Sequence, residues 1–90
     1  MDIRFIKAVQ FTKLIKANGR LREFNFRKIN RPEGEFFSVN VCDDRGERIL
    51  FRMQKENNTW RLESSQLPQW VVMQEEKMNE SIEEELQNKN

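Results

Sequence analysis

The sequence predicts an α+β domain in which an antiparallel meander of about five strands carries one C-terminal helix packed across one face. Apolar and polar residues alternate through the first two-thirds of the chain, and turn motifs separate the alternating runs. The last third changes to a three- and four-residue apolar repeat. We expect a single domain over 1–90, with strands at about 4–63, a helix at about 68–87 and a frayed tail at 88–90.

The first hairpin is predicted by the Asn18-Gly19 pair, because both residues tolerate the positive φ angles of a type I′ turn. Such a turn pairs Ala17 with Arg20 and fixes the register of both strands. Directly opposed residues share a face of the sheet. One side of the hairpin is therefore apolar and contains Val9, Phe11, Ile15, Phe24 and Phe26.

Three further turn motifs, NRPEGE, DDRGE and ENNT, separate the remaining strands. Gly46 suits a type I turn closed by a G1 bulge, and a two-residue turn at Asn57-Asn58 places Met53 beside Leu62. Each strand then has one apolar and one polar face, as in antiparallel sheets with one solvated side.

The apolar repeat of the last third begins at Leu67, and Pro68 suits a first helical turn. Gln74 interrupts the apolar stripe, so a second helix capped by Ser81 and Glu84 is an alternative to one helix of about 18–20 residues. The single helix is simpler, and we expect it to cover the apolar sheet face. The expected core is Phe11, Phe24, Phe26, Phe37, Val39, Val41, Ile49, Phe51, Trp60, Leu62, Trp70, Val71, Met78 and Ile82.

The composition argues against catalysis. The chain has no His, no Tyr and one Cys, which excludes Ser/His/Asp and Cys/His nucleophilic sites, His metal sites and thiolate cages. Asp43-Asp44 suits a turn, and the glutamates of the last third suit a solvated helix face. We therefore expect a non-enzymatic protein with no cofactor and no metal. The N-terminus does not resemble a signal peptide and no run suits a membrane span, so we expect a cytoplasmic protein without a membrane partner.

The net charge of +1 conceals an asymmetry: residues 1–62 carry +6 and residues 63–90 carry −5. A basic binding face with an acidic tail gives this pattern, and so do a basic sheet and an acidic helix that neutralise each other. On the polar sheet face, Arg and Lys suit phosphates, Asn suits base edges and Phe suits base stacking. The candidate nucleic-acid-binding residues are Lys16, Asn25, Arg27, Phe36, Arg48, Arg52 and Arg61, with Asn40 and Gln54 beside them and Glu23 and Glu63 diluting the charge.

The run REFNFRKINRPEGEFFSV, followed by RILFRM and an amphipathic helix, resembles the repeat of the Pur-alpha family. The resemblance covers roughly residues 20–53 and the helix; Arg27 stands where that family carries Asp, and residues 57–62 add a strand. It implies a Whirly-like fold, binding of single-stranded DNA or RNA on the sheet, and dimers formed from two repeats. The matching positions are Phe24, Phe26, Gly34, Phe36, Val39, Arg48 and Leu50.

Two other functions remain open at this point. One is a protein-interaction or self-associating module that uses an edge strand or the acidic C-terminal helix. The other is a ligand-binding cup between helix and sheet, which the large Phe and Trp side chains are expected to fill.

Overall fold

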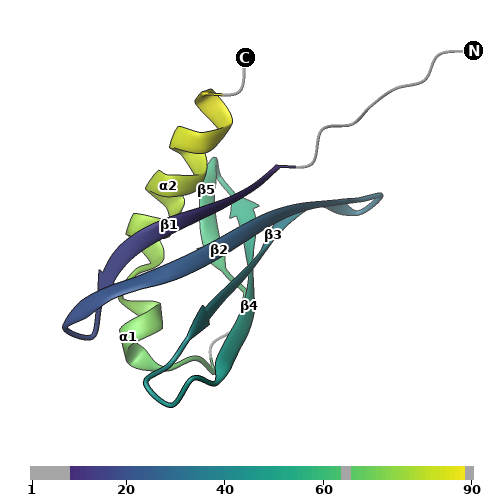
Figure 1. Cartoon of the computed structure of the whole chain (residues 1–90). Helices are drawn as coiled ribbons and strands as arrows, with labels where there is room; N and C mark the ends of the chain where they lie inside the picture. Colours follow the sequence, from purple (N-terminus) through teal and green to yellow (C-terminus); the bar gives the residue numbers. More distant parts are fainter. Residues whose placement is uncertain (1–8, 64–65, 89–90) are drawn as a thin grey trace, which may run out of the picture.

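The computed structural model describes residues 9–63 and 66–88 (Figure 1). Its five strands form one antiparallel sheet in the order β1-β2-β3-β4-β5, which curves into a half-barrel around the helices and confirms the expected fold class. The expected start of the first strand near residue 4, and residues 89–90 of the expected tail, lie outside the described residues. The elements are β1 (Gln10–Ala17), β2 (Arg20–Arg31), β3 (Gly34–Cys42), β4 (Arg48–Glu56), β5 (Thr59–Leu62), α1 (Gln69–Val72) and α2 (Glu75–Gln87).

The turns form where the sequence predicts them. Asn18 and Gly19 adopt φ angles of +54° and +87°, and Ala17 pairs with Arg20, so the predicted register of the first hairpin is confirmed. Asn57 and Asn58 also have positive φ angles, and Met53 lies opposite Leu62. Between β3 and β4, the Gly46 amide donates to the Asp43 carbonyl at 3.0 Å. Residues that tolerate positive φ therefore set the register of the sheet.

The core lies between the sheet and the helices, and all fourteen expected core residues belong to it. Phe11, Ile49, Leu62 and Trp70 are partly buried at its rim, and the other ten are buried. Ile15, Ala17 and Met53 complete the buried set. An aromatic contact joins β3 to β5 across β4: the Phe37 and Trp60 ring centroids lie 4.9 Å apart, edge to face.

The C-terminal helical segment is divided, in contrast to the expected continuous helix. Met73 and Gln74 form a turn between α1 and α2, at the polar interruption of the apolar stripe. The alternative with a helix opening at Ser81 is also wrong, because α2 begins at Glu75 and the Ser81 hydroxyl donates to the Lys77 carbonyl within that helix. Helix α2 lies along the inside of the half-barrel and contacts β5 and β1 (Figure 1).

Arg22 is the charged residue that the helices bury against the sheet, with 6% of its surface exposed. Its Nε donates to the Ala17 carbonyl at 2.8 Å, and its Nη2 donates to Asp44 at the same distance. The guanidinium carbon lies 4.6 Å from the ring centre of Trp70. Arg22 therefore joins β2, the β3–β4 turn and α1, so its buried donors are satisfied.

Arg22→Met is expected to lower the free energy of unfolding by about 1–3 kcal/mol, since it removes charge-assisted hydrogen bonds from a buried site. Arg20→Met is the matched control: Arg20 also pairs with Asp44, at 3.3 Å, but its side chain is 65% exposed. Its loss should change stability by less than about 0.5 kcal/mol. Urea unfolding measures both variants, and equal effects would contradict the role of Arg22.

Helix α2 also covers the outer edge of β5. The Trp60 amide donates to Asn79 Oδ1 at 2.8 Å, and the Leu62 amide donates to Glu75 Oε2 at 2.7 Å. Unpaired backbone donors at a sheet edge invite pairing with another strand. Two side chains of α2 thus take the place that a sixth strand would have at this edge.

Asn79→Ala is expected to destabilise the fold by about 1–3 kcal/mol, because the Trp60 amide loses its acceptor at a partly buried position. Glu76→Ala, an exposed change on the same helix, should have little effect. Thermal or urea unfolding distinguishes the two variants. If Asn79→Ala is as stable as the wild type, water bonds the Trp60 amide as well as Asn79 Oδ1 does, and the prediction is wrong.

Candidate nucleic-acid interface

The sheet face turned away from the helices, called the outer face below, is formed by the strand side chains that alternate with the core. The register aligns them in rows across the strands: Arg27, Ser38 and Arg52 form one row. Ile29, Phe36, Gln54 and Arg61 form the next row. Neighbouring strands lie about 4.8 Å apart, so these rows bring residues from four strands into one area.

Four cations share this area of the outer face with Phe36: Arg27, Arg31, Arg52 and Arg61, called the basic cluster below. The guanidinium carbon of Arg52 lies 4.6 Å from the Phe36 ring centre, and that of Arg31 lies 5.8 Å from it. Phe36 is half-buried, so guanidinium groups cover part of the ring that we expected to be open. A guanidinium plane on an aromatic ring still offers a surface on which a base can stack.

The other three candidate residues lie outside the basic cluster. Asn25 belongs to a polar chain in which Thr12 Oγ1 donates to Asn25 Oδ1 at 2.6 Å and Asn25 Nδ2 donates to Asn40 Oδ1 at 3.1 Å. Its amide is thus already engaged within the protein. Arg48 pairs with Cys42 near the far end of the sheet, and Lys16 pairs with Leu21 beside the first turn.

The outer-face cations are not neutralised by the acidic helix. Ion pairs among the described residues join Lys13 to Glu84, Arg20 and Arg22 to Asp44, and Lys28 to Glu35. None of these pairs includes a member of the basic cluster, Lys16 or Arg48. Lys13–Glu84, at 3.8 Å, is the one pair among them that links the sheet to α2. The acidic helix and the basic cluster therefore lie on opposite sides of the sheet.

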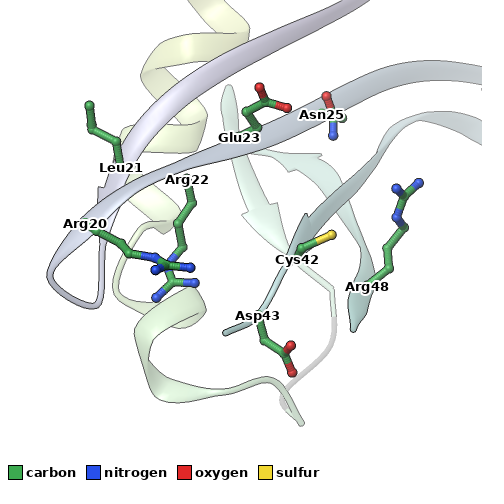
Figure 2. Close-up of a pocket in the computed structure, with 8 residues that line it drawn as sticks. All are labelled: Arg20, Leu21, Arg22, Glu23, Asn25, Cys42, Asp43 and Arg48. Atoms are coloured by element: carbon green, nitrogen blue, oxygen red, sulfur yellow. The ribbon is translucent and has the colours of Figure 1, made fainter. Parts of the chain in front are cut away.

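A groove of about 450 Å³ opens beside the outer face where β2 separates from β3 (Figure 2). The two strands pair from Asn25–Asn40 to Arg31–Gly34, and beyond Asn25 strand β2 pairs only with β1. Arg20 and Arg22 converge at one end of the groove, whereas Glu23 and Asn25 extend away from them. Both of these arginines pair with Asp44, and carboxylates line the groove as well, so its charge is largely balanced.

Three outer-face leucines were not among the candidate site residues. Leu14, Leu21 and Leu50 are 56%, 63% and 66% exposed. Leu14 lies on β1 opposite Glu23 and is a diagonal neighbour of Leu21, which lies on β2 opposite Lys16. The register predicted from Asn18-Gly19 already places Leu14 and Leu21 on the outer face, and the alternation of RILFRMQ places Leu50 there, so the signal was present in the sequence. Arg31 was missed in the same way.

Comparison with known proteins returned no match among protein-family models, curated proteins or solved structures. The resemblance to the Pur-alpha repeat therefore stays a prediction. Neither helix in the described parts of the chain is long and apolar enough to cross a membrane. Over the same residues, no group of three or more His, Cys, Asp or Glu side chains is placed to hold a metal ion.

Proposed function

We propose that this chain is a small, non-enzymatic cytoplasmic module that binds single-stranded DNA or RNA on the outer face of its sheet. The observation that carries the proposal is the basic cluster around Phe36, whose guanidinium groups have no carboxylate partner among the described residues. Unpaired arginines on an open surface attract phosphates and release counterions when a nucleic acid binds.

In this proposal the arginines on either side of Phe36 contact the backbone of the strand. A base stacks on the layer that Arg52 forms over Phe36. Ser38, which lies between Arg27 and Arg52, offers hydrogen bonds to base edges. Gln54, which lies between Phe36 and Arg61 in the next row, does so as well. A single strand suits this surface better than a duplex, because stacking requires bases that are not enclosed in a helix.

Self-association is the second candidate function, and a homodimer is part of this proposal. It is favoured by the exposed leucines of the outer face and by the edge of β1, along which no strand of the described residues pairs on the side away from β2.

Binding of a fluorescent single-stranded oligonucleotide of about 16 nucleotides, followed by anisotropy, tests the main proposal. If Arg27, Arg31, Arg52 and Arg61 each neutralise one phosphate, the affinity should fall about 50-fold between about 50 and 200 mM salt. Arg27→Glu with Arg52→Glu should abolish binding without unfolding the protein. The absence of binding by the wild type at about 50 mM salt would exclude the proposed function.

A matched control separates the outer face from net charge. Lys55→Glu with Lys77→Glu changes the charge by the same amount, but Lys55 lies near the Trp60 ring on the core side of the sheet and Lys77 lies on α2. This variant should retain most of the binding. If both double variants lose affinity for the oligonucleotide equally, binding depends on the overall charge of the protein, and the outer face is not the binding site.

A further inference from the structure

The two edge strands of the sheet, β5 and β1, differ in what bonds to their outward backbone groups. At β5, the outward amides of Trp60 and Leu62 are bonded by side chains of α2. At β1, no strand within the described residues pairs on the side away from β2. In the part of the chain that the structure describes, this edge of eight residues has neither a covering strand nor a helix side chain bonded to its backbone, and such an edge is a pairing surface.

The register shows which backbone groups of β1 are available. The Lys28 amide donates to the Val9 carbonyl, so Val9, Phe11, Lys13 and the other odd-numbered residues bond to β2. The N–H and C=O groups of Thr12, Leu14 and Lys16 consequently point away from β2. A groove of about 350 Å³ lies on this side, between β1 and α2, and is lined by Lys13, Leu14, Ile15, Lys16, Lys77, Glu80, Ser81 and Glu84.

We propose that β1 pairs in antiparallel fashion with β1 of a second copy of this chain, about a two-fold axis at Leu14. This inference specifies the self-association named above and does not require nucleic acid. It places Leu14 opposite Leu14 of the second copy and Thr12 opposite Lys16. On the core side it places Lys13 opposite Ile15 and Phe11 opposite Ala17.

Neighbouring registers are less favourable. An axis at Lys13 places two ammonium groups directly opposite each other, which destabilises a strand pair. An axis at Thr12 places Leu14 opposite Gln10 on the outer face, so that the exposed leucine meets a polar side chain. Of these three registers, the axis at Leu14 is the one that both keeps the lysines of the two copies apart and places the exposed leucine opposite another leucine.

Exposed apolar surface supports the same register. Leu14 and Leu21 are 56% and 63% exposed on the outer face, and they are diagonal neighbours across β1 and β2. The two-fold axis sets Leu14 of one copy against Leu14 of the other, and Leu21 of each copy lies one strand away from this pair. Pairing therefore covers apolar area that is solvated in the single chain.

Glutamates of α2 also line the groove at the seam, together with Lys77 of the same helix. Within one chain, Lys13 pairs with Glu84 of α2 at 3.8 Å. Lys13 of the second copy, placed beside Ile15, comes to the groove that Glu80 lines one helical turn before Glu84. Each α2 thus presents successive glutamates to the lysine of its own β1 and to the lysine of the second copy.

Sedimentation equilibrium over about a hundredfold range of concentration, without oligonucleotide, tests the dimer. The wild-type mass should rise from 11.0 kDa toward twice that value. Leu14→Lys should keep the mass at 11.0 kDa, because it places like charges at the axis. Leu50→Lys changes a similarly exposed leucine on β4, an interior strand far from the β1 edge, and should dimerise as the wild type does. A wild type that stays monomeric, or equal loss in both variants, would overturn the proposal.

The register is tested by disulfide trapping in a Cys42→Ser background, since Cys42 is an exposed free thiol. Leu14→Cys should form a covalent dimer on mild oxidation, because residues at a hydrogen-bonded antiparallel pair have Cα atoms about 5.5 Å apart, within disulfide range. Thr12→Cys, on the same edge and face, should not. Trapping of Thr12→Cys instead of Leu14→Cys, or of neither variant, would contradict the register. All these variants keep the basic cluster, so loss of dimer is separable from loss of nucleic-acid binding.

Discussion

The two-residue period of the strands is the constraint on which this structure depends. Each strand places its aromatic and branched side chains on one side, and the helices of the last third cover that side. Burial of apolar surface supplies the main driving force for this arrangement. A shift of one residue in any strand would exchange its two faces, so the turns that set the register also set which arginines reach the outer face.

The same segregation separates charge. The basic residues of the first two-thirds are concentrated on the sheet, and six glutamates lie on α2, on the opposite side. Lys13–Glu84 is the one ion pair among the described residues that links them. The sequence allowed two explanations for its charge asymmetry. This geometry favours a polarised molecule with an open basic surface over mutual neutralisation of sheet and helix. Polarised surfaces favour charged partners.

Much of the fold followed from local signals, whereas tertiary details did not. Asn18-Gly19 and Asn57-Asn58 predicted their turns and registers because few conformations fit a two-residue loop. The buried role of Arg22 was not predicted, since the register gives only its face, and its partners Asp44 and Trp70 are distant in sequence. The groove beside β2 depends on where two strands diverge, and the stacking of Arg52 on Phe36 depends on side-chain conformation. Neither leaves a pattern in the sequence.

The central claim is that the outer face carries unpaired guanidinium groups that attract a single strand. A titration of the ¹⁵N-labelled protein with a single-stranded oligonucleotide at low salt, followed by heteronuclear NMR, addresses it residue by residue. The expected result is a set of shifts at the Nε–Hε groups of Arg27, Arg52 and Arg61 and at the amides of β3 and β4, while the resonances of α2 and the buried Arg22 stay in place. Shifts concentrated on α2, or no shifts at any site, would contradict the claim.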